Sequence, residues 1–182
     1  ERPEKNPFLE GFYQNKKQYA FQAQIFFLLS RFQQQKELRQ QDLFEQITIC
    51  DYLFAKDRIF AHLNLDENEL ALYEKIFELL DTRLSKPDLV IYLKANPHIL
   101  LERIRKREVD YERNITAEYL QMLVKLYNQF FFHYESSPLL VVETSDIDFV
   151  QNPEDLQQLV KAIGNIKGGT VHFSPLGSRN RD

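Results

Sequence analysis

The sequence predicts an α/β fold in which a parallel sheet is wrapped by helices. Three short apolar runs have strand composition and do not alternate with polar residues: Ile47 to Cys50, Leu89 to Leu93 and Leu139 to Val142. Strands of this kind have both faces covered, as in a parallel sheet. Helical patterns separate the runs, and strands that alternate with helices are joined by right-handed crossovers.

The helices are expected in this order. The first runs from about Lys16 to Gln41, and the second from Asp66, a good N-cap, to about Arg83. The others are Pro97 to Arg107, Thr116 to His133 and Pro153 to Ile163. Three strands are few for such a sheet, and no glycine precedes Gly11, so we expect N-terminal strands that this chain lacks.

Length and composition bound the domain organisation. A chain of 182 residues with 43% apolar content suits one domain with a substantial core, which we expect over residues 1–163. The residues from Gly164 onward include Gly168-Gly169 and the polar stretch Ser178 to Arg181. We expect residues 164–182 to form a loose C-terminal tail.

The charge balance excludes two classes of partner. A formal charge of −4 and a pI near 5.7 argue against a nucleic-acid polymer or an anionic membrane as partner, because both require a concentrated positive field.

No apolar run reaches the ~20 residues that span a bilayer. Cys50 is the sole cysteine and cannot form an internal disulfide, so we expect a reducing, cytoplasmic location.

Several cations lie at the end of the helix that follows the second apolar run. Arg103 and Arg107 are four residues apart and share a face. Cations at a helix C-terminus also favour the helix dipole, so a solvated helix end is the plain interpretation. The polar segment Glu108 to Arg113 favours a second one, in which a mobile flap carries charges over a bound phosphate.

These residues resemble the deoxynucleoside kinases, the group that includes deoxycytidine, deoxyguanosine and deoxyadenosine kinases. Arg103, Arg107 and Glu112 fall into register with that family's flap pattern, approximately R-x-x-x-R-x-R-x-x-E. The similarity runs almost from end to end. It includes Glu1 to Phe8, the spacing of Tyr13, Gln24 and Arg31, the triplets Ile59-Phe60-Ala61 and Pro87-Asp88-Leu89, and Asp146 to Phe149.

The resemblance implies a P-loop-kinase-like fold, and the chain departs from the family pattern in three ways. Val109 stands where the flap has its third arginine, and Asp51-Tyr52-Leu53 replaces a D-R-S or E-R-S motif. The family's phosphate loop, of G-x-x-x-x-G-K-[ST] type, is expected upstream of Glu1. These 182 residues alone are therefore expected to be inactive.

The resemblance implies transfer of the γ-phosphoryl group of ATP to a deoxynucleoside 5′-hydroxyl, with Mg²⁺ as cofactor, in nucleotide salvage. Glu1 would be the catalytic base and Arg107 would bind the phosphates. Arg103 would stack on the adenine of ATP, for which its planar guanidinium is suited. Asp148 and Phe149 would complete the ATP site, and Asp51, at a strand end, would bind the metal.

The nucleoside pocket can be argued from residue types as well. Gln24 and Arg31 lie two turns apart on one stripe of an otherwise apolar helix, and polar groups on a buried stripe need partners. Asp57 would hold Arg31 towards the base. Phe60 would stack on the base, with ordinary core packing as its alternative.

By resemblance, Tyr13 and Glu112 would hold the sugar 3′-hydroxyl. An aspartate near the base accepts from exocyclic amino groups, so we expect deoxyadenosine, deoxycytidine or deoxyguanosine to be preferred over thymidine.

Two alternatives to a deoxynucleoside kinase remain: a non-catalytic nucleoside-binding or dimerisation module, and a thymidylate-kinase-like nucleotide kinase.

The helix from Asp66 to Arg83 predicts that the chain assembles into an oligomer. It has one apolar stripe at Leu70, Tyr73, Phe77 and Leu80 and a second at Leu72, Ile76 and Leu79. One core does not easily cover both, so we expect a symmetric homodimer through this helix and part of the first.

Overall fold

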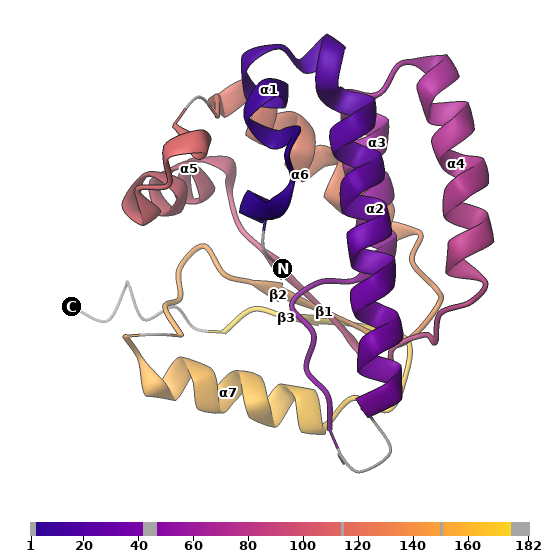
Figure 1. Ribbon diagram of the computed structural model, residues 1–182. Helices are drawn as coiled ribbons and strands as arrows, with labels where there is room; N and C mark the ends of the chain where they lie inside the picture. Colours follow the sequence, from indigo (N-terminus) through magenta and orange to yellow (C-terminus); the bar gives the residue numbers. More distant parts are fainter. Residues whose placement is uncertain (1–2, 42–46, 114, 150, 176–182) are drawn as a thin grey trace. The chain divides into compact units, whose positions relative to one another are not determined.

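The computed structural model describes residues 3–41, 47–113, 115–149 and 151–175 (Figure 1). The chain divides into two compact units, Glu1–Ser85 and Lys86–Asp182. Among the described residues, no helix is both long enough and apolar enough to cross a bilayer. The expectation of one domain over residues 1–163 stays a prediction.

The described part of the first unit is built from helices. Its elements in chain order are η1 (Pro3–Lys5), α1 (Leu9–Gln14), α2 (Lys16–Gln41), η2 (Phe54–Lys56), α3 (Asp57–Asn64) and α4 (Glu67–Asp81). Helix α2 contacts α1, α3 and α4 and so organises the unit. The predicted long first helix is confirmed.

A small apolar core joins α2, η2, α3 and α4. Its buried members are Leu28, Phe54, Ala61, Tyr73 and Phe77. The Phe54 and Phe77 rings stack with their centroids 5.2 Å apart. Close packing also joins α1 to α2, because a Cβ on Gly11 would come within 2.9 Å of the Tyr19 ring.

The N-terminus of α4 is fixed by a capping box. The Asp66 side chain accepts from the backbone N–H groups of Asn68 and Glu69, each at 2.9 Å. The Glu69 carboxylate accepts from the Asp66 backbone N–H in return, at 3.1 Å. The predicted N-cap is confirmed, and α4 ends at Asp81, two residues before the expected Arg83.

The predicted strand over Ile47 to Cys50 is wrong. Residues 47–50 have no regular secondary structure, and Ile47 and Ile49 are 80% and 93% exposed. An apolar run becomes a strand only where another strand pairs with it. The sheet of this structure contains β1, β2 and β3, all from the second unit, so this run is not part of it.

The second unit contains the sheet. Its elements are β1 (Val90–Lys94), α5 (Pro97–Arg107), η3 (Asp110–Glu112), α6 (Ala117–Phe132), β2 (Leu139–Glu143), α7 (Pro153–Gly164) and β3 (Thr170–Phe173). The strands run parallel in the order β1-β2-β3, with Val90 opposite Leu139 and Val142 opposite Phe173. The other two predicted strands and the three predicted helices of this region are confirmed.

Helices cover both faces of this sheet. On one face, the Tyr92 ring of β1 stacks on Phe131 of α6, with centroids 4.3 Å apart. On the other, Leu140 and Val142 of β2 pack with Leu159 of α7. The covered faces explain why the β2 sequence is continuously apolar. In β1 only one face is buried, since Ile91 and Leu93 are 39% and 53% exposed.

Strand β3 corrects the expectation of a loose tail from Gly164 onward. Thr170–Phe173 pairs with β2, and the Gly169 carbonyl accepts from the Leu139 N–H at 2.9 Å. Gly169 has φ +69°, which a glycine adopts without strain at the turn into the strand. The β-branched and aromatic residues after this glycine pair were the signal in the sequence.

The capping box allows a direct test of the α4 assignment. Asp66→Ala removes the acceptor for two helix N–H groups and should lower the free energy of unfolding by about 1 kcal/mol. Urea denaturation followed by circular dichroism measures this. Asn68→Ala, an exposed substitution in the same turn, is the matched control and should change stability by less than about 0.5 kcal/mol. Equal effects of the two would contradict the capping role.

Candidate functional site

Helix α2 brings two polar side chains into the interior of the first unit. Gln24 and Arg31 are only 5% and 6% exposed, although their neighbours on the helix are largely apolar. Asp57, the first residue of α3, is fully buried. Three such groups require partners, because an unpaired buried charge costs several kcal/mol.

The partners are one another. The Arg31 Nη1 donates to Asp57 Oδ1 in a buried ion pair. The Gln24 Nε2 donates to Asp57 Oδ2 at 2.7 Å and to the Asp57 carbonyl oxygen at 3.0 Å. The Tyr73 hydroxyl of α4 donates to the same Oδ2 at 2.6 Å. We call Gln24, Arg31, Asp57 and Tyr73 the Asp57 network.

Aromatic rings enclose the guanidinium of Arg31. It lies 5.0 Å from the Phe27 ring centroid and 5.5 Å from that of Tyr52. The Tyr52 hydroxyl bonds to the Gln34 side chain. Tyr52 therefore supports the arginine of the network. Sequence reasoning noted Tyr52 only as a lost cation.

The other predicted residues of the first unit are less buried than this network. Phe60 is half-buried and lies nearly one turn after Asp57 on α3. Tyr13 is half-buried on α1, where its ring meets Phe12 edge-on at 5.4 Å. The predicted base Glu1 lies outside the described residues.

The predicted metal residue Asp51 is exposed. Within the described ranges, no group of three or more His, Cys, Asp or Glu side chains is arranged to hold a metal. A single accessible carboxylate still fits Mg²⁺, which commonly takes one or two carboxylates and obtains its other ligands from phosphates and water.

In the second unit, Arg103 is anchored on the segment that follows β2. Its Nη2 donates to the carbonyl oxygens of Thr144 at 2.7 Å and Ile147 at 3.4 Å. Its Nη1 donates to the Thr144 hydroxyl at 3.2 Å. The structure thus brings Arg103 together with the segment that contains Asp148 and Phe149. Their role in an ATP site stays a prediction.

A residue that sequence reasoning missed supports this segment. Asp155, in the first turn of α7, is fully buried, and its Oδ2 accepts from the Asp148 N–H at 3.3 Å. The signal available was an aspartate two residues after the Pro153 that opens a helix, a pattern that usually marks only an N-terminal turn.

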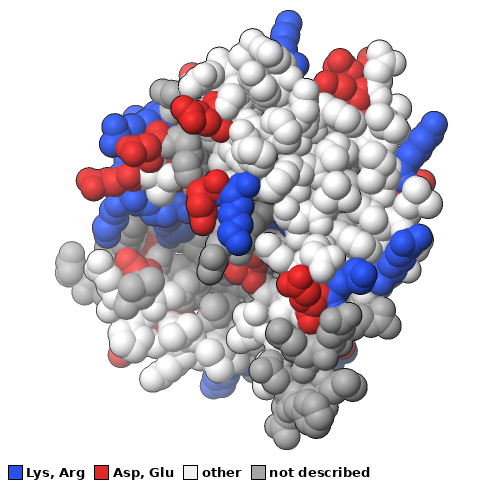
Figure 2. Space-filling view, in the orientation of Figure 1, with Lys and Arg blue, Asp and Glu red and all other residues white. Residues whose placement is uncertain are grey.

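Arg107, the last residue of α5, pairs with Glu112 of the predicted flap. Arg107 Nη2 donates to both carboxylate oxygens of Glu112, at 3.0 and 3.3 Å. Glu108 has φ 53° and ψ 35°, which ends α5 and turns the chain towards η3, and half-buried Val109 precedes η3. Basic and acidic side chains lie next to one another over α5 (Figure 2). The sequence predicted separate roles for Arg107 and Glu112 and did not predict their pairing.

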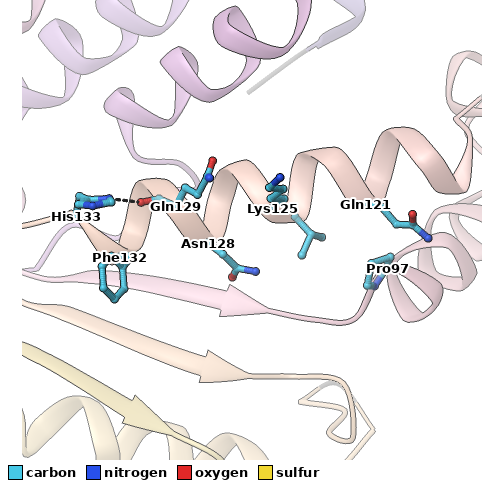
Figure 3. Close-up of a pocket in the computed structure, with 8 residues that line it drawn as sticks. Pro97, Gln121, Lys125, Asn128, Gln129, Phe132 and His133 are labelled. Atoms are coloured by element: carbon cyan, nitrogen blue, oxygen red, sulfur yellow. Dashed lines mark hydrogen bonds between the residues drawn. The ribbon is translucent and has the colours of Figure 1, made fainter.

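A wide hollow of 580 Å³ lies elsewhere in this unit, along α6 (Figure 3). It is lined by α6 side chains between Gln121 and His133 and by Pro97 of α5. The His133 Nδ1 donates to the Gln129 carbonyl oxygen at its edge, at 2.9 Å. None of the predicted site residues lines this hollow.

Comparison with known proteins agrees with this arrangement. The family model described as deoxynucleoside kinase matches residues 1–167. A deoxyguanosine kinase of Bacillus subtilis is 38% identical over 165 residues, which are 88% of this chain and 80% of that protein. A deoxyadenosine kinase of Dictyostelium discoideum is 37% identical over 162 residues, which are 86% of this chain and 64% of that protein.

A solved structure shares the fold. The deoxyadenosine kinase of M. mycoides with bound dATP superposes with a TM-score of 0.73 at 27% identity, covering 87% of this chain and 82% of that one. The predicted α/β, P-loop-kinase-like fold is thereby confirmed. A family match over most of the chain and a relative at 38% identity lead to one conclusion. The chain belongs to the deoxynucleoside kinase family.

Proposed function

We propose that this protein transfers the γ-phosphoryl group of ATP to the 5′-hydroxyl of a deoxynucleoside in nucleotide salvage, and that it prefers bases with an exocyclic amino group. The observation that carries the proposal is the Asp57 network. The family match favours a nucleoside kinase over the non-catalytic and thymidylate-kinase-like alternatives.

A buried ion pair is a poor way to gain stability. The desolvation of Arg31 and Asp57 offsets most of their attraction, and apolar residues of similar size commonly stabilise a core at least as well. The pair therefore favours a recognition role over a purely structural one. Phe27 and Tyr52 flank the guanidinium of Arg31, so these rings fix its orientation in addition to the ion pair with Asp57.

The network also dictates which bases suit it. The Gln24 amide nitrogen is engaged by Asp57, so the base pairs with the Gln24 carbonyl oxygen. That oxygen accepts from an N–H donor, such as the exocyclic amino group of adenine or cytosine. The O4 atom of thymine is itself an acceptor and would meet the oxygen unfavourably.

The second unit supplies the groups proposed for the phosphate donor. Arg103 and the segment from Thr144 to Phe149 would hold the adenine, and Arg107 the phosphates. While Arg107 and Glu112 are paired, each neutralises the charge of the other. Glu112 would pass from Arg107 to the sugar 3′-hydroxyl together with Tyr13 when a nucleoside binds.

The chemical step follows from these groups. Glu1 would accept the 5′-hydroxyl proton as that oxygen attacks the γ-phosphorus, and the bond to the bridging oxygen of ADP breaks. Mg²⁺, when bound near Asp51 and the phosphates, neutralises charge that develops on the transferred group.

Phe60 would stack on the base. We also propose that the protein is located in the cytoplasm.

The first unit has an apolar face suited to a second copy of the chain. Leu72 and Leu79 of α4 are 50% and 65% exposed, while Tyr73 and Phe77 of the same helix are buried in the core. Leu29 of α2 is 49% exposed, and Figure 2 shows a broad uncharged area over α2. Exposed leucines on two helices support a symmetric homodimer.

Base preference is the first test. In the protein encoded by its full gene, kcat/KM for the best of deoxyadenosine, deoxycytidine and deoxyguanosine should exceed that for thymidine by about 5- to 150-fold, the equivalent of one good base contact. Asp57→Asn should reduce this ratio, because the network loses its carboxylate. Asp81→Asn, an exposed change of the same chemistry, should leave it unchanged. Equal use of thymidine by the wild type would refute the preference.

Donor binding is tested at Arg103. Arg103→Ala removes three hydrogen bonds to the segment after β2, and should raise the KM for ATP by roughly 10-fold with a smaller effect on the nucleoside KM. Steady-state kinetics with each substrate varied in turn measures both constants. Arg105→Ala, on an exposed position of the same helix, serves as control. Equal increases in the KM for ATP and the KM for the nucleoside would contradict the placement of Arg103 in the ATP site.

Assembly is tested by sedimentation velocity at micromolar concentration, where a dimer is expected. The double variant Leu72→Asp/Leu79→Asp places charges in the proposed interface and should give monomers, since unpaired charges at an apolar interface are costly. Leu156→Asp, at a 46% exposed leucine of α7, should stay dimeric. A wild type that sediments only as a monomer would overturn the dimer.

A further inference from the structure

Tyr73 is the one member of the Asp57 network that the chain provides from α4. It is fully buried, and its ring lies in the core beside Phe77, with centroids 6.1 Å apart. The sequence placed it in an apolar stripe, a position that phenylalanine fills equally well. Its hydroxyl, however, donates to Asp57 Oδ2 at 2.6 Å, a short bond of the kind made to a charged acceptor.

The hydroxyl is a donor at all ordinary pH values. Burial first, and the charge of neighbouring Glu74 second, raise the pKa of Tyr73 well above its usual value of 10.0. Arg31 and Arg58 act in the opposite direction with smaller effect. The phenol therefore keeps its proton and directs it to the carboxylate.

The two oxygens of Asp57 have different tasks. Oδ1 accepts from Arg31, and Oδ2 accepts from both Gln24 and Tyr73. A carboxylate can rotate about its Cβ–Cγ bond, since this torsion has a broad profile. A second donor on Oδ2, from a helix other than α2, resists that rotation and keeps each oxygen facing its partner.

We infer that Tyr73 is a positioning residue for base selection: its hydroxyl fixes the Asp57 carboxylate, and through it the orientation of the Gln24 amide. The inference rests on the proposed function. With the carboxylate fixed, Gln24 meets the base with its oxygen. Without the hydroxyl, the carboxylate can turn, and the Gln24 amide then keeps only its bond to the Asp57 carbonyl oxygen. The less constrained amide can flip, so that an N–H group faces the base and donates to O4 of thymine.

The experiment compares four nucleosides in the wild type and in Tyr73→Phe, using the protein encoded by its full gene. The substitution removes one oxygen atom and leaves the ring in the core. We expect the ratio of kcat/KM for the preferred nucleoside to that for thymidine to fall at least threefold. The change should lie mainly in KM, because the reacting groups are untouched.

Two controls separate positioning from general loss of structure. Tyr92→Phe removes another buried hydroxyl, one that donates to Asn128 Oδ1 at 3.2 Å in the second unit. Phe77→Leu loosens the core beside Tyr73 without removing a polar group. Both should leave the ratio at its wild-type value.

A double variant tests whether Tyr73 acts through Asp57. In an Asp57→Asn background, Tyr73→Phe should have no further effect on the ratio, because the group that Tyr73 positions is already changed.

The outcomes are distinct. A Tyr73→Phe protein that keeps the wild-type ratio, or that loses the same factor on all four nucleosides, overturns the positioning role and leaves the proposed kinase function intact. A further loss of selectivity in the Asp57→Asn background also overturns it, because Tyr73 would then act independently of Asp57. A wild type that phosphorylates none of the four nucleosides refutes the proposed function, and this inference with it.

Discussion

The burial of the Asp57 carboxylate is the constraint on which the first unit depends. A carboxylate without contact to water is tolerated only where donors saturate it. Here the donors come from α2 and α4, while Asp57 itself opens α3. The ion pair with Arg31 joins α2 to α3, and the bond from Tyr73 joins α4 to both. The loss of either charged partner would leave the other buried and unpaired, at a cost of about 3–5 kcal/mol. The apolar core of Leu28, Tyr73 and Phe77 surrounds this polar centre and excludes water from it.

In the second unit, the proposed ATP site requires cations that remain accessible to a ligand. Arg103 is held by carbonyl oxygens and a hydroxyl, which direct a guanidinium without neutralising it. Arg107 is held by Glu112, a carboxylate on the flap. Glu108, in the left-handed conformation, ends α5 and turns the chain between Arg107 and Glu112. A non-glycine residue in that conformation costs about 1–2 kcal/mol, a modest strain of the kind that gathers at functional sites.

Much of this arrangement was predictable from local patterns. The spacing of Gln24 and Arg31 on an apolar helix predicted a buried polar stripe, and the Asp66 position predicted the start of α4. The errors share one physical cause, since each depended on a partner distant in sequence. Ile47 to Cys50 has strand composition and no place in this sheet, and Thr170–Phe173 forms a strand only because β2 lies beside it. The sequence pattern indicates only a core position for Tyr73, and the structure is needed to show that its hydroxyl donates to Asp57, 16 residues away.

A structure of the protein in complex with deoxyadenosine tests the central claim most directly. The base edge should lie within hydrogen-bonding distance of the Gln24 carbonyl oxygen, with its amino group as donor. The Arg31 and Asp57 side chains should remain paired, and the Tyr73 hydroxyl should remain on Oδ2. A base bound away from Gln24, or a complex in which the Arg31 and Asp57 pair has opened, would contradict the account.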